Sequence, residues 1–390
     1  MKKKIIITAI CSLALGAFFV YHWAQKNADC RELLDDNFSH LAYLGECGEI
    51  KAYYNSEDSI YFSDGKSVVL KYGTEFGFED SLPNTIRLLH GARVFDVSIK
   101  ELYNAKEEKA TNSDNVYYHK KDYNLNSSDG RYGFFVDMEI PKGNSASDKA
   151  FRAWMMKEAT RDIFGLFGDD VNVAVMSCDT PDEIIQGLEE YHTKWNDLYQ
   201  KTYEGPSALG SYVLVEVNHI AENDEYATYY YYSYIYNGGA HGGYHSYYIT
   251  YDKNRDVFVS ATNTINPSKQ RFVEKEVKKE LMIKKGFEKE EIERCEKEDA
   301  PMPIYFAISD ICNPDDAEEL SKTDLEDAFP LQHFAILPDG IVVSYHPCQT
   351  GAFAEGEFHV LLPFDKIKGC LMYEYKEDPS WRPRLTDILR

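Results

Sequence analysis

The sequence has little positive charge for its length. It holds 42 Lys and Arg against 65 Asp and Glu in 390 residues, which gives a formal net charge of −23. Nucleic-acid binding depends on clustered Lys and Arg at the phosphates, so we expect no nucleic-acid partner. The same acidity repels an anionic membrane surface, and any membrane contact is therefore expected from the N-terminal segment only.

Several signatures of catalysis and metal binding are also missing. The sequence contains no Cys-x-x-Cys pair, no phosphate-binding loop and no Gly-x-Gly-x-x-Gly turn. Neither Ser246 nor Ser344 lies in a Gly-x-Ser-x-Gly or Ser-x-x-Lys motif. Carboxylates are so abundant that no glycosidase pair can be picked from them. We therefore expect no cofactor and no metal site, we assign no catalytic residue, and we favour a protein that is not an enzyme.

Aromatic residues are plentiful by contrast, with 30 Tyr and 21 Phe. Tyr suits pleated, half-buried surfaces, so the composition favours β-structure. A hydrophobic content of 44% supports real cores, and the length predicts two or three folding units.

The N-terminus has the pattern of an export segment. Lys2, Lys3 and Lys4 precede an apolar run over 5–20, and Tyr21 and Trp23 follow it. Basic residues before an apolar stretch indicate a signal or an anchor. We favour an uncleaved anchor within residues 1–28, because small residues are missing at a cleavage spacing. The protein is therefore expected in the cell envelope, on the periplasmic or extracellular side.

Seven cysteines follow the export segment, and an oxidising compartment favours pairing among them. The most plausible bridges by local spacing are Cys30 with Cys47 and Cys295 with Cys312.

The remaining chain predicts two folded regions and a short tail. Residues 29–130 form an expected β-rich module of short strands, with a hairpin turn over Ser63–Lys66. Residues 131–376 form an expected α+β domain, with mixed or antiparallel sheets and packed helices. Residues 377–390 are the tail.

The elements of the second region follow from periodicity and helix caps. We expect a strand over 134–140 and a helix over 147–164. Thr180, Pro181 and Glu183 predict the start of a second helix that reaches about Tyr199. The expected later elements are strands over 212–220, 227–236 and 244–251, a charged helix after Pro267, a hairpin over 334–346 and a strand over 358–362.

The most distinctive segment is the glycine-rich turn over 234–245. Gly238 and Gly239 precede His241, and two more glycines follow it between two aromatic strands. The turn could present His241 and backbone amides to a ligand, or it could be a structural hairpin in which His241 bonds to local carbonyls. A metal pair of His241 and His245 requires the strand to persist across the glycines, and we do not predict one.

The tyrosine-rich strand that precedes this turn also permits two interpretations. Tyr230, Tyr232, Tyr234 and Tyr236 alternate onto one face. Such a row could stack on sugars or anchor a protein partner. The favoured interpretation is a sheet in which amphipathic Tyr residues cover one side.

Two segments carry a resemblance to a known family. The turn over 236–242 reads Tyr-Asn-Gly-Gly-Ala-His-Gly, and 345–356 reads Tyr-His-Pro-Cys-Gln-Thr-Gly-Ala-Phe-Ala-Glu-Gly. Together they resemble the RsiV-like extracellular domain, found in the lysozyme-sensing anti-sigma factor RsiV and beside some peptidoglycan deacetylase domains. The similarity covers about residues 131–375. Cys348 and Gln349 depart from the Tyr and Glu usual in the family.

The resemblance implies an α+β extracellular fold and a binding role toward lysozyme or peptidoglycan. The residues it nominates, together with the aromatic strand and the glycine turn, are Tyr234, Tyr236, Gly238, Gly239, His241, Tyr345, Gln349 and Phe353. Four residues before the apolar run leave no room for a cytoplasmic domain, and about fifteen after Tyr375 leave none for a deacetylase. We therefore expect neither activity here.

Three functions remain open from sequence. The first is a non-catalytic envelope protein that binds lysozyme or cell-wall glycan. The second is a hydrolase of envelope polymers in which His241 acts as general base. The third is a structural or assembly component that makes contacts through its N-terminal β-module.

Overall fold

The computed structural model describes residues 42–54, 59–71, 74–77, 85–105, 115–124, 133–167, 178–202, 211–237, 242–298, 331, 333–347, 349–350, 356–375 and 378. These residues divide into two compact units: 42–90 with 94–105, and 91–93 with 115–378. Within them no helix is long and apolar enough to cross a membrane. The expected N-terminal anchor lies outside the described residues. Helices and mixed sheets confirm the α+β class.

The first unit is built mainly from short antiparallel strands. Its strands are β1 (Ala42–Cys47), β2 (Ile50–Tyr54), β3 (Ser59–Phe62), β4 (Ser67–Val69), β5 (Thr74–Gly77), β6 (Thr85–His90) and β7 (Arg93–Ser98), followed by helix α2 (Ile99–Asn104). They form sheets of order β1-β2-β3-β4 and β5-β6-β7. The predicted turn over Ser63–Lys66 joins β3 to β4, with Gly65 at φ +92°. The unit has its own apolar core, which includes Ile60, Phe62 and Leu88.

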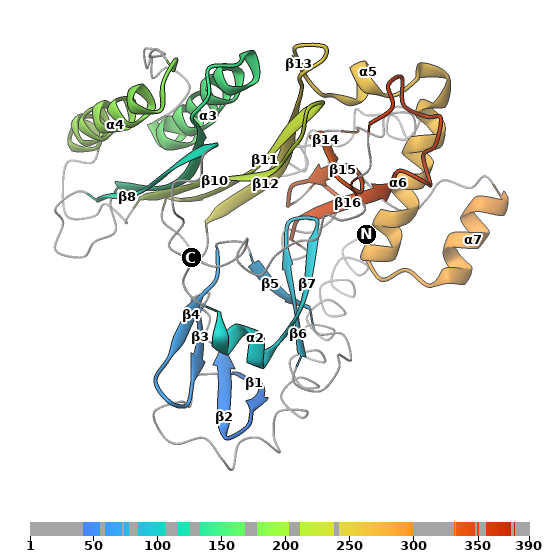
Figure 1. Cartoon of the computed structure of the whole chain (residues 1–390), viewed down its shortest axis with the longest axis horizontal. Helices are drawn as coiled ribbons and strands as arrows, with labels where there is room; N and C mark the ends of the chain where they lie inside the picture. The colour runs from blue at the N-terminus through green and yellow to red at the C-terminus, as the bar shows by residue number, and fades with distance from the viewer. Residues whose placement is uncertain are drawn as a thin grey trace, which may run out of the picture. The chain divides into compact units, whose positions relative to one another are not determined.

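The second unit is organised by a six-stranded sheet of order β13-β12-β11-β10-β9-β8 (Figure 1). Its strands are β8 (Val116–Asn124), β9 (Gly133–Pro141), β10 (Tyr212–Glu222), β11 (Tyr226–Tyr236), β12 (Gly243–Asp252) and β13 (Val257–Phe258). Neighbouring strands are antiparallel except β9 and β10. A parallel pair needs a crossover connection, and the chain between β9 and β10 contains two helices.

Those helices, α3 (Ala146–Phe164) and α4 (Pro181–Thr202), cover one face of the sheet (Figure 1). A 3-10 turn, η3 (Gly165–Phe167), follows α3. Trp195 of α4 is fully buried and donates from its indole to the Ile163 carbonyl over 3.0 Å. The predicted cap is present, since the Glu183 amide bonds to the Thr180 hydroxyl. The two helices lie side by side, with α3 over β9 to β12 and α4 over β8 and β9.

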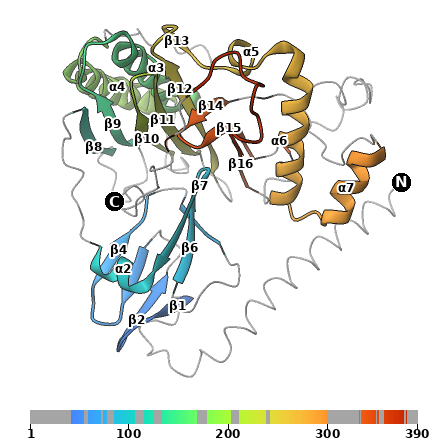
Figure 2. The ribbon, with the colours of Figure 1, turned by 45° about the vertical axis from the view of Figure 1, so that its right-hand side comes forward.

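The opposite face of the sheet packs against a three-stranded sheet of β14 (Phe334–Leu337), β15 (Gly340–Tyr345) and β16 (Phe358–Pro363), as Figures 1 and 2 show. Thr228 and Thr250 donate to the Ile336 carbonyl and thereby join the two sheets. Helix α6 (Gln270–Lys284) packs on β16. The remaining elements are α5 (Ala261–Thr264), η4 (Pro267–Lys269) and α7 (Lys289–Glu298).

The boundary between the two units differs from the one predicted at residues 130 and 131. Strand β8 pairs with β9 from Val116 to Asn124, so it belongs to the second unit. Its residues read like the short strands before them, and only the pairing assigns them to the later sheet.

Candidate functional site

The tyrosines of strand β11 differ in exposure along its length. Tyr230 and Tyr232 are buried in the second unit, while Tyr234 and Tyr236 at the end of β11 are half-buried. A Cβ placed on Gly242 would approach the Tyr234 ring to 2.5 Å. Both faces of β11 are therefore packed, whereas the favoured interpretation expected a sheet buried on one side with Tyr covering the other; at least one glycine of the turn permits close packing.

The other nominated residues divide between the core and segments that are not described. Tyr345 is 1% exposed and belongs to the core that the three-stranded sheet forms with helix α6. Gln349 accepts a hydrogen bond over 2.7 Å from the His346 amide, which closes a local turn. The positions outside the described residues are Gly238, Gly239, His241 and Phe353. A role for His241 as general base stays a prediction.

The described cysteines show no pairing. Cys47, Cys178 and Cys370 form no disulfide with one another. Cys30, Cys312 and the side chain of Cys295 lie outside the described residues, so the two bridges stay predictions.

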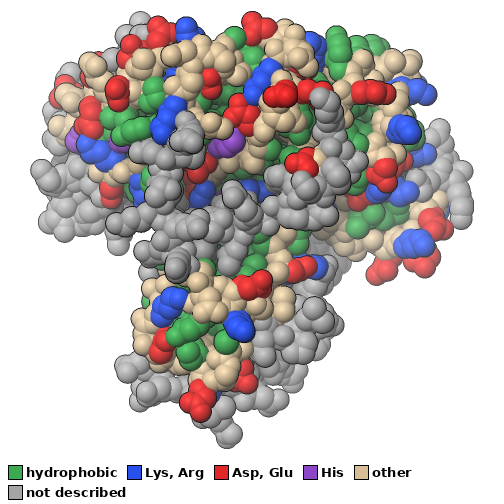
Figure 3. Space-filling view, in the orientation of Figure 1, with side chains coloured by type: hydrophobic (Ala, Val, Ile, Leu, Met, Phe, Trp, Pro, Cys, Tyr) green, Lys and Arg blue, Asp and Glu red, His purple; other side chains and the backbone are tan. Residues whose placement is uncertain are grey.

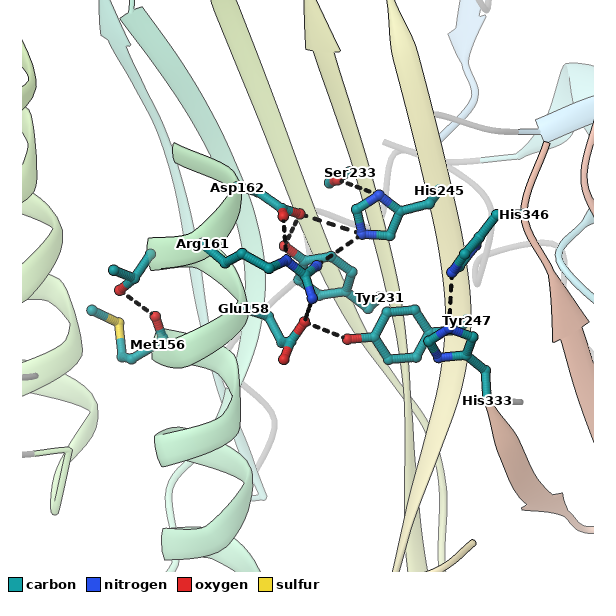
Figure 4. Close-up of polar contacts among 11 residues, drawn as sticks. Met156, Glu158, Arg161, Asp162, Tyr231, Ser233, His245, Tyr247, His333 and His346 are labelled. Carbon is teal, nitrogen blue, oxygen red and sulfur yellow. Dashed lines mark hydrogen bonds and ion pairs between the residues drawn. The ribbon is translucent and has the colours of Figure 1, made fainter. Parts of the chain in front are cut away.

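A different group of polar residues meets where β11 and β12 face helix α3. His245 and Tyr247 alternate with Ser246 along β12, so the first two point to the helix and Ser246 points to the opposite face. We call the group on the helix side the α3 network. It consists of Glu158, Arg161, Asp162, Tyr231, Ser233, His245 and Tyr247 (Figure 4).

Asp162 is the most heavily bonded member of the α3 network. Its side chain is 3% exposed and accepts from Tyr231 Oη over 2.7 Å and from Arg161 Nε over 2.8 Å. Nε2 of His245 lies 3.4 Å away. Burial acts to raise the pKa of Asp162, but His245, Arg161 and Tyr231 together hold it below its usual range. Asp162 is therefore a buried, paired carboxylate.

Arg161 connects this buried carboxylate to the surface. Its Nη1 lies 2.5 Å from Glu158, which also accepts from Tyr247 Oη over 2.8 Å. Its Nη2 lies 3.0 Å from Nε2 of His245. Although three of its nitrogens are engaged, the side chain is 53% exposed. The guanidinium is thus held in a fixed orientation with part of its surface open to solvent.

The contact with Arg161 also fixes the state of the His245 ring. A guanidinium can only donate, so Nε2 of His245 accepts, and Nδ1 carries the proton that points to Ser233 Oγ at 3.3 Å. Burial lowers the pKa of His245 to about 4, with Asp162 opposing and His346 and Arg161 assisting. The ring is neutral at physiological pH.

Two more imidazoles lie next to His245. We call His333, directly before β14, and His346, directly after β15, the histidine pair. Their Nε2 atoms are 2.9 Å apart, and their ring centroids are 4.5 Å apart. The His346 ring is 5.1 Å from the His245 ring, and His333 lies against Tyr247 at 4.4 Å. His333 has φ +45°, the left-handed region uncommon for a side-chain-bearing residue.

A second polar cluster lies on the other face of β12, and we call it the β16 network. Ser246 donates to Glu357 Oε2 over 2.6 Å and lies 3.0 Å from His359 Nε2. Nδ1 of His359 is 2.8 Å from Ser344 Oγ. Burial would raise the pKa of Glu357, but interactions with His346, His359 and Ser246 lower it to about 2. The carboxylate therefore stays ionised.

The β16 network contains a hydroxyl beside an imidazole, an arrangement that can support nucleophilic catalysis. Here Ser246 is 0% exposed, and its hydroxyl proton points to Glu357 rather than to the imidazole. His359 is 7% exposed. This geometry provides cohesion between β12 and the three-stranded sheet, and it gives a substrate no access to the hydroxyl.

The sequence contains little that predicts the α3 network. Glu158, Arg161 and Asp162 share helix α3 with the buried residues Phe151, Met155 and Ala159. The available signal was the i, i+3, i+4 spacing of one cation and two carboxylates. His245 entered the sequence interpretation only as a doubtful metal partner of His241. In the part of the chain described, no group of three or more His, Cys, Asp or Glu is arranged to hold a metal ion.

Comparisons with known proteins find two similar solved structures and one family model. A solved structure of a DUF3298 family member from Bacteroides fragilis is similar at 15% sequence identity and a TM-score of 0.43; the match covers 66% of this chain and 92% of that one. A DUF3298 family protein from Pseudomonas aeruginosa PAO1 is similar at 11% identity and a TM-score of 0.41, and the match covers 67% of this chain and 95% of that one. A comparison with curated proteins finds no match. The model of DUF3298, a family of unknown function, matches residues 255–365, from the turn before β13 through β16.

Proposed function

We propose that this chain is a non-catalytic binding protein of the cell envelope. The observation that supports this best is the internal bonding of the α3 and β16 networks. Their hydroxyls, imidazoles and carboxylates are bonded to one another, and Ser246, Asp162 and Glu158 are each less than 10% exposed. A general base must reach the proton that it abstracts from a substrate, and these groups are held inward instead.

The same geometry leaves one group suited to recognition. Arg161 is fixed by two carboxylates and an imidazole, yet about half of its side chain is open to solvent. A planar guanidinium held in place loses little entropy when it binds a carboxylate, a carbonyl or vicinal hydroxyls. His245 and His346, each about one-fifth exposed, lie next to it and extend the polar surface.

The charge of the chain suits a basic protein partner such as lysozyme. A net charge of −23 attracts a cationic protein over long range and raises its association rate. Acidic and basic side chains are interspersed over the face seen in Figure 3, so the field alone does not define an orientation. Particular groups such as Arg161 would supply the specificity. Cell-wall glycan, which presents hydroxyl and carboxylate groups, is the other ligand we propose.

The proposed location is the outer side of a membrane, reached through the N-terminal basic and apolar segment. Lys2, Lys3 and Lys4 would remain on the cytoplasmic side, and the apolar run over 5–20 would act as the anchor. Fractionation of cells that produce the full chain tests this. Recovery with the membrane fraction, together with digestion of the folded part by an external protease, is the expected result, and a cytosolic protein would contradict it.

The binding function is tested by titrating the full chain with lysozyme and, separately, with soluble peptidoglycan fragments. We expect saturable binding to one of them, weakened about tenfold or more by Arg161→Lys, which keeps the charge and removes the planar fork. Arg271→Lys on the exposed face of α6 is the matched control and should change nothing. Absence of binding to both ligands at about 100 μM would refute the proposal. Release of new glycan ends over time would favour the hydrolase instead.

A further inference from the structure

The histidine pair has a geometry that its role in packing does not require. His333 and His346 come from opposite ends of the β14–β15 hairpin, and they meet through their Nε2 atoms, 2.9 Å apart. When no metal ion lies between them, one of these nitrogens must carry a proton and donate it in a hydrogen bond to the other. Two imidazoles that point their Nε2 atoms at one spot can also share a metal ion in place of that proton.

The separation of the two nitrogens agrees with joint ligation. Imidazole nitrogens lie about 2.0–2.1 Å from a bound Zn²⁺. Two such ligands at a right angle are therefore about 2.9 Å apart, and at a tetrahedral angle about 3.4 Å. A square-planar or octahedral arrangement, which Cu²⁺ and Ni²⁺ prefer with nitrogen ligands, needs almost no movement of either ring.

The surroundings of His346 supply a second and independent observation. Its Nδ1 and Oε1 of Glu357 are both buried, and neither has a hydrogen-bond partner among the described residues. The two atoms are 3.9 Å apart, slightly too far for a hydrogen bond. A metal-bound histidine usually donates its other ring N–H to a carboxylate. When Nε2 of His346 binds a metal, its ring proton must sit on Nδ1, where it faces Glu357.

The charge around the pair also favours a cation. Glu357, Glu158 and Asp162 are carboxylates within the adjoining networks, and Arg161 is the cation that those networks contain. A divalent ion would reduce this local excess of negative charge. An anionic ligand at the same place would increase it.

We propose that His333 and His346 together bind one divalent metal ion of the borderline class, Cu²⁺, Ni²⁺ or Zn²⁺, with Glu357 as the carboxylate that orients His346. The described residues supply only these two ligands, in keeping with the absence there of a three-residue group. Water, or a donor from a bound partner, would complete the coordination. An open site of this kind binds in the micromolar range, and it lies beside Arg161, where the proposed partner would dock.

The test is a calorimetric titration of the full, chelator-treated chain with NiCl₂ at pH 7.5. We expect one site with a dissociation constant near 10 μM or tighter, and a rise in the melting temperature at saturation. His333→Gln and His346→Gln should each weaken binding at least tenfold, and Glu357→Gln should weaken it less. His219→Gln is the matched control, because His219 lies 3.5 Å from Glu222 and is equally exposed.

Two results would overturn the proposal. One is wild-type binding no tighter than about 1 mM, and the other is unchanged binding after the His333 substitution. If His346→Gln does not fold, as its melting curve without metal would reveal, the His333 variant alone decides. A spectroscopic readout adds detail: Cu²⁺ bound by both rings shows nitrogen hyperfine coupling in its paramagnetic resonance spectrum, and either substitution should reduce the number of coupled nitrogens.

Discussion

The α3 network and the β16 network use similar side chains on opposite faces of one strand. His245 and Ser246 are consecutive in β12, and each joins a different network. On the helix side, two carboxylates are balanced by Arg161, whose side chain is 53% exposed. On the other side, Glu357 is held by a hydroxyl and by neighbouring imidazoles, and Ser246 is 0% exposed.

The two networks contain similar side chains, and their difference in exposure gives them different roles. A buried, hydrogen-bonded network fixes the packing of the two sheets, because each group that loses its partner then carries a desolvation cost. A network with one exposed cation can also fix the packing of buried groups, and its cation remains available to a ligand in solvent. We therefore assign cohesion to the β16 network and both cohesion and recognition to the α3 network.

The largest expected effect comes from removing Asp162. Asp162→Ala deprives Arg161 and Tyr231 of their acceptor and leaves the buried end of the α3 network unbalanced. Breaking a buried ionic group costs about 3–5 kcal/mol, and we expect a loss of that size in urea unfolding. Asp365→Ala, at an exposed turn after β16, is the control and should cost less than about 0.5 kcal/mol. Equal losses would show that the α3 network is not cohesive.

The next effect compares two hydroxyls of the β16 network. Ser246→Ala removes the donor to the ionised Glu357, and hydrogen bonds to charged groups contribute about 1.5–3 kcal/mol. Ser344→Ala removes a contact with His359 alone, for which about 1 kcal/mol is expected. Both positions are fully buried, so the size of the cavity is matched. Thermal unfolding in which Ser344→Ala is the more damaging change would contradict the central role of Glu357.

A smaller effect distinguishes buried from exposed acceptors on the helix side. Tyr231→Phe removes a hydroxyl that donates to the buried Asp162, and we expect a loss of about 1.5 kcal/mol. Tyr251→Phe removes a similar bond from the same sheet face, but its acceptor, Asp256, is exposed and can be hydrated instead. We expect it to cost about 0.5 kcal/mol. Indistinguishable unfolding midpoints for the two variants would argue against a special role for burial here.

Much of the fold could be predicted because its signals are local. The Thr180 cap predicts the start of α4, and the Ser63–Lys66 turn predicts a hairpin. In each case the hydrogen bonds that determine the structure lie within a few residues. Strand β8 was assigned to the wrong unit because strand pairing is not local.

The candidate site could not be predicted from the sequence for the same reason. Asp162 and His245 are brought together by a helix crossover and by the pairing of β11 with β12, which no short motif encodes. Sequence reasoning selected His241 because glycines surround it. It passed over His245, four residues later, because a single His in an aromatic strand has no local mark of function.

The smallest expected effect is a pH dependence confined to the α3 network. The pKa of Asp162 is lower in the folded chain than in the unfolded chain, so its contribution to stability is complete above about pH 5. The contribution is lost as the pH falls through the lower, folded value, because the unfolded state then binds the proton first. Asp162→Asn cannot titrate. The stability gap between wild type and this variant should therefore narrow between pH 5 and pH 2, whereas the gap for Ser344→Ala should stay level. A constant gap for Asp162→Asn, measured by urea unfolding at each pH, would mean that Asp162 is not held ionised by Arg161 and Tyr231, and the contrast between the two faces of β12 would then rest on exposure alone.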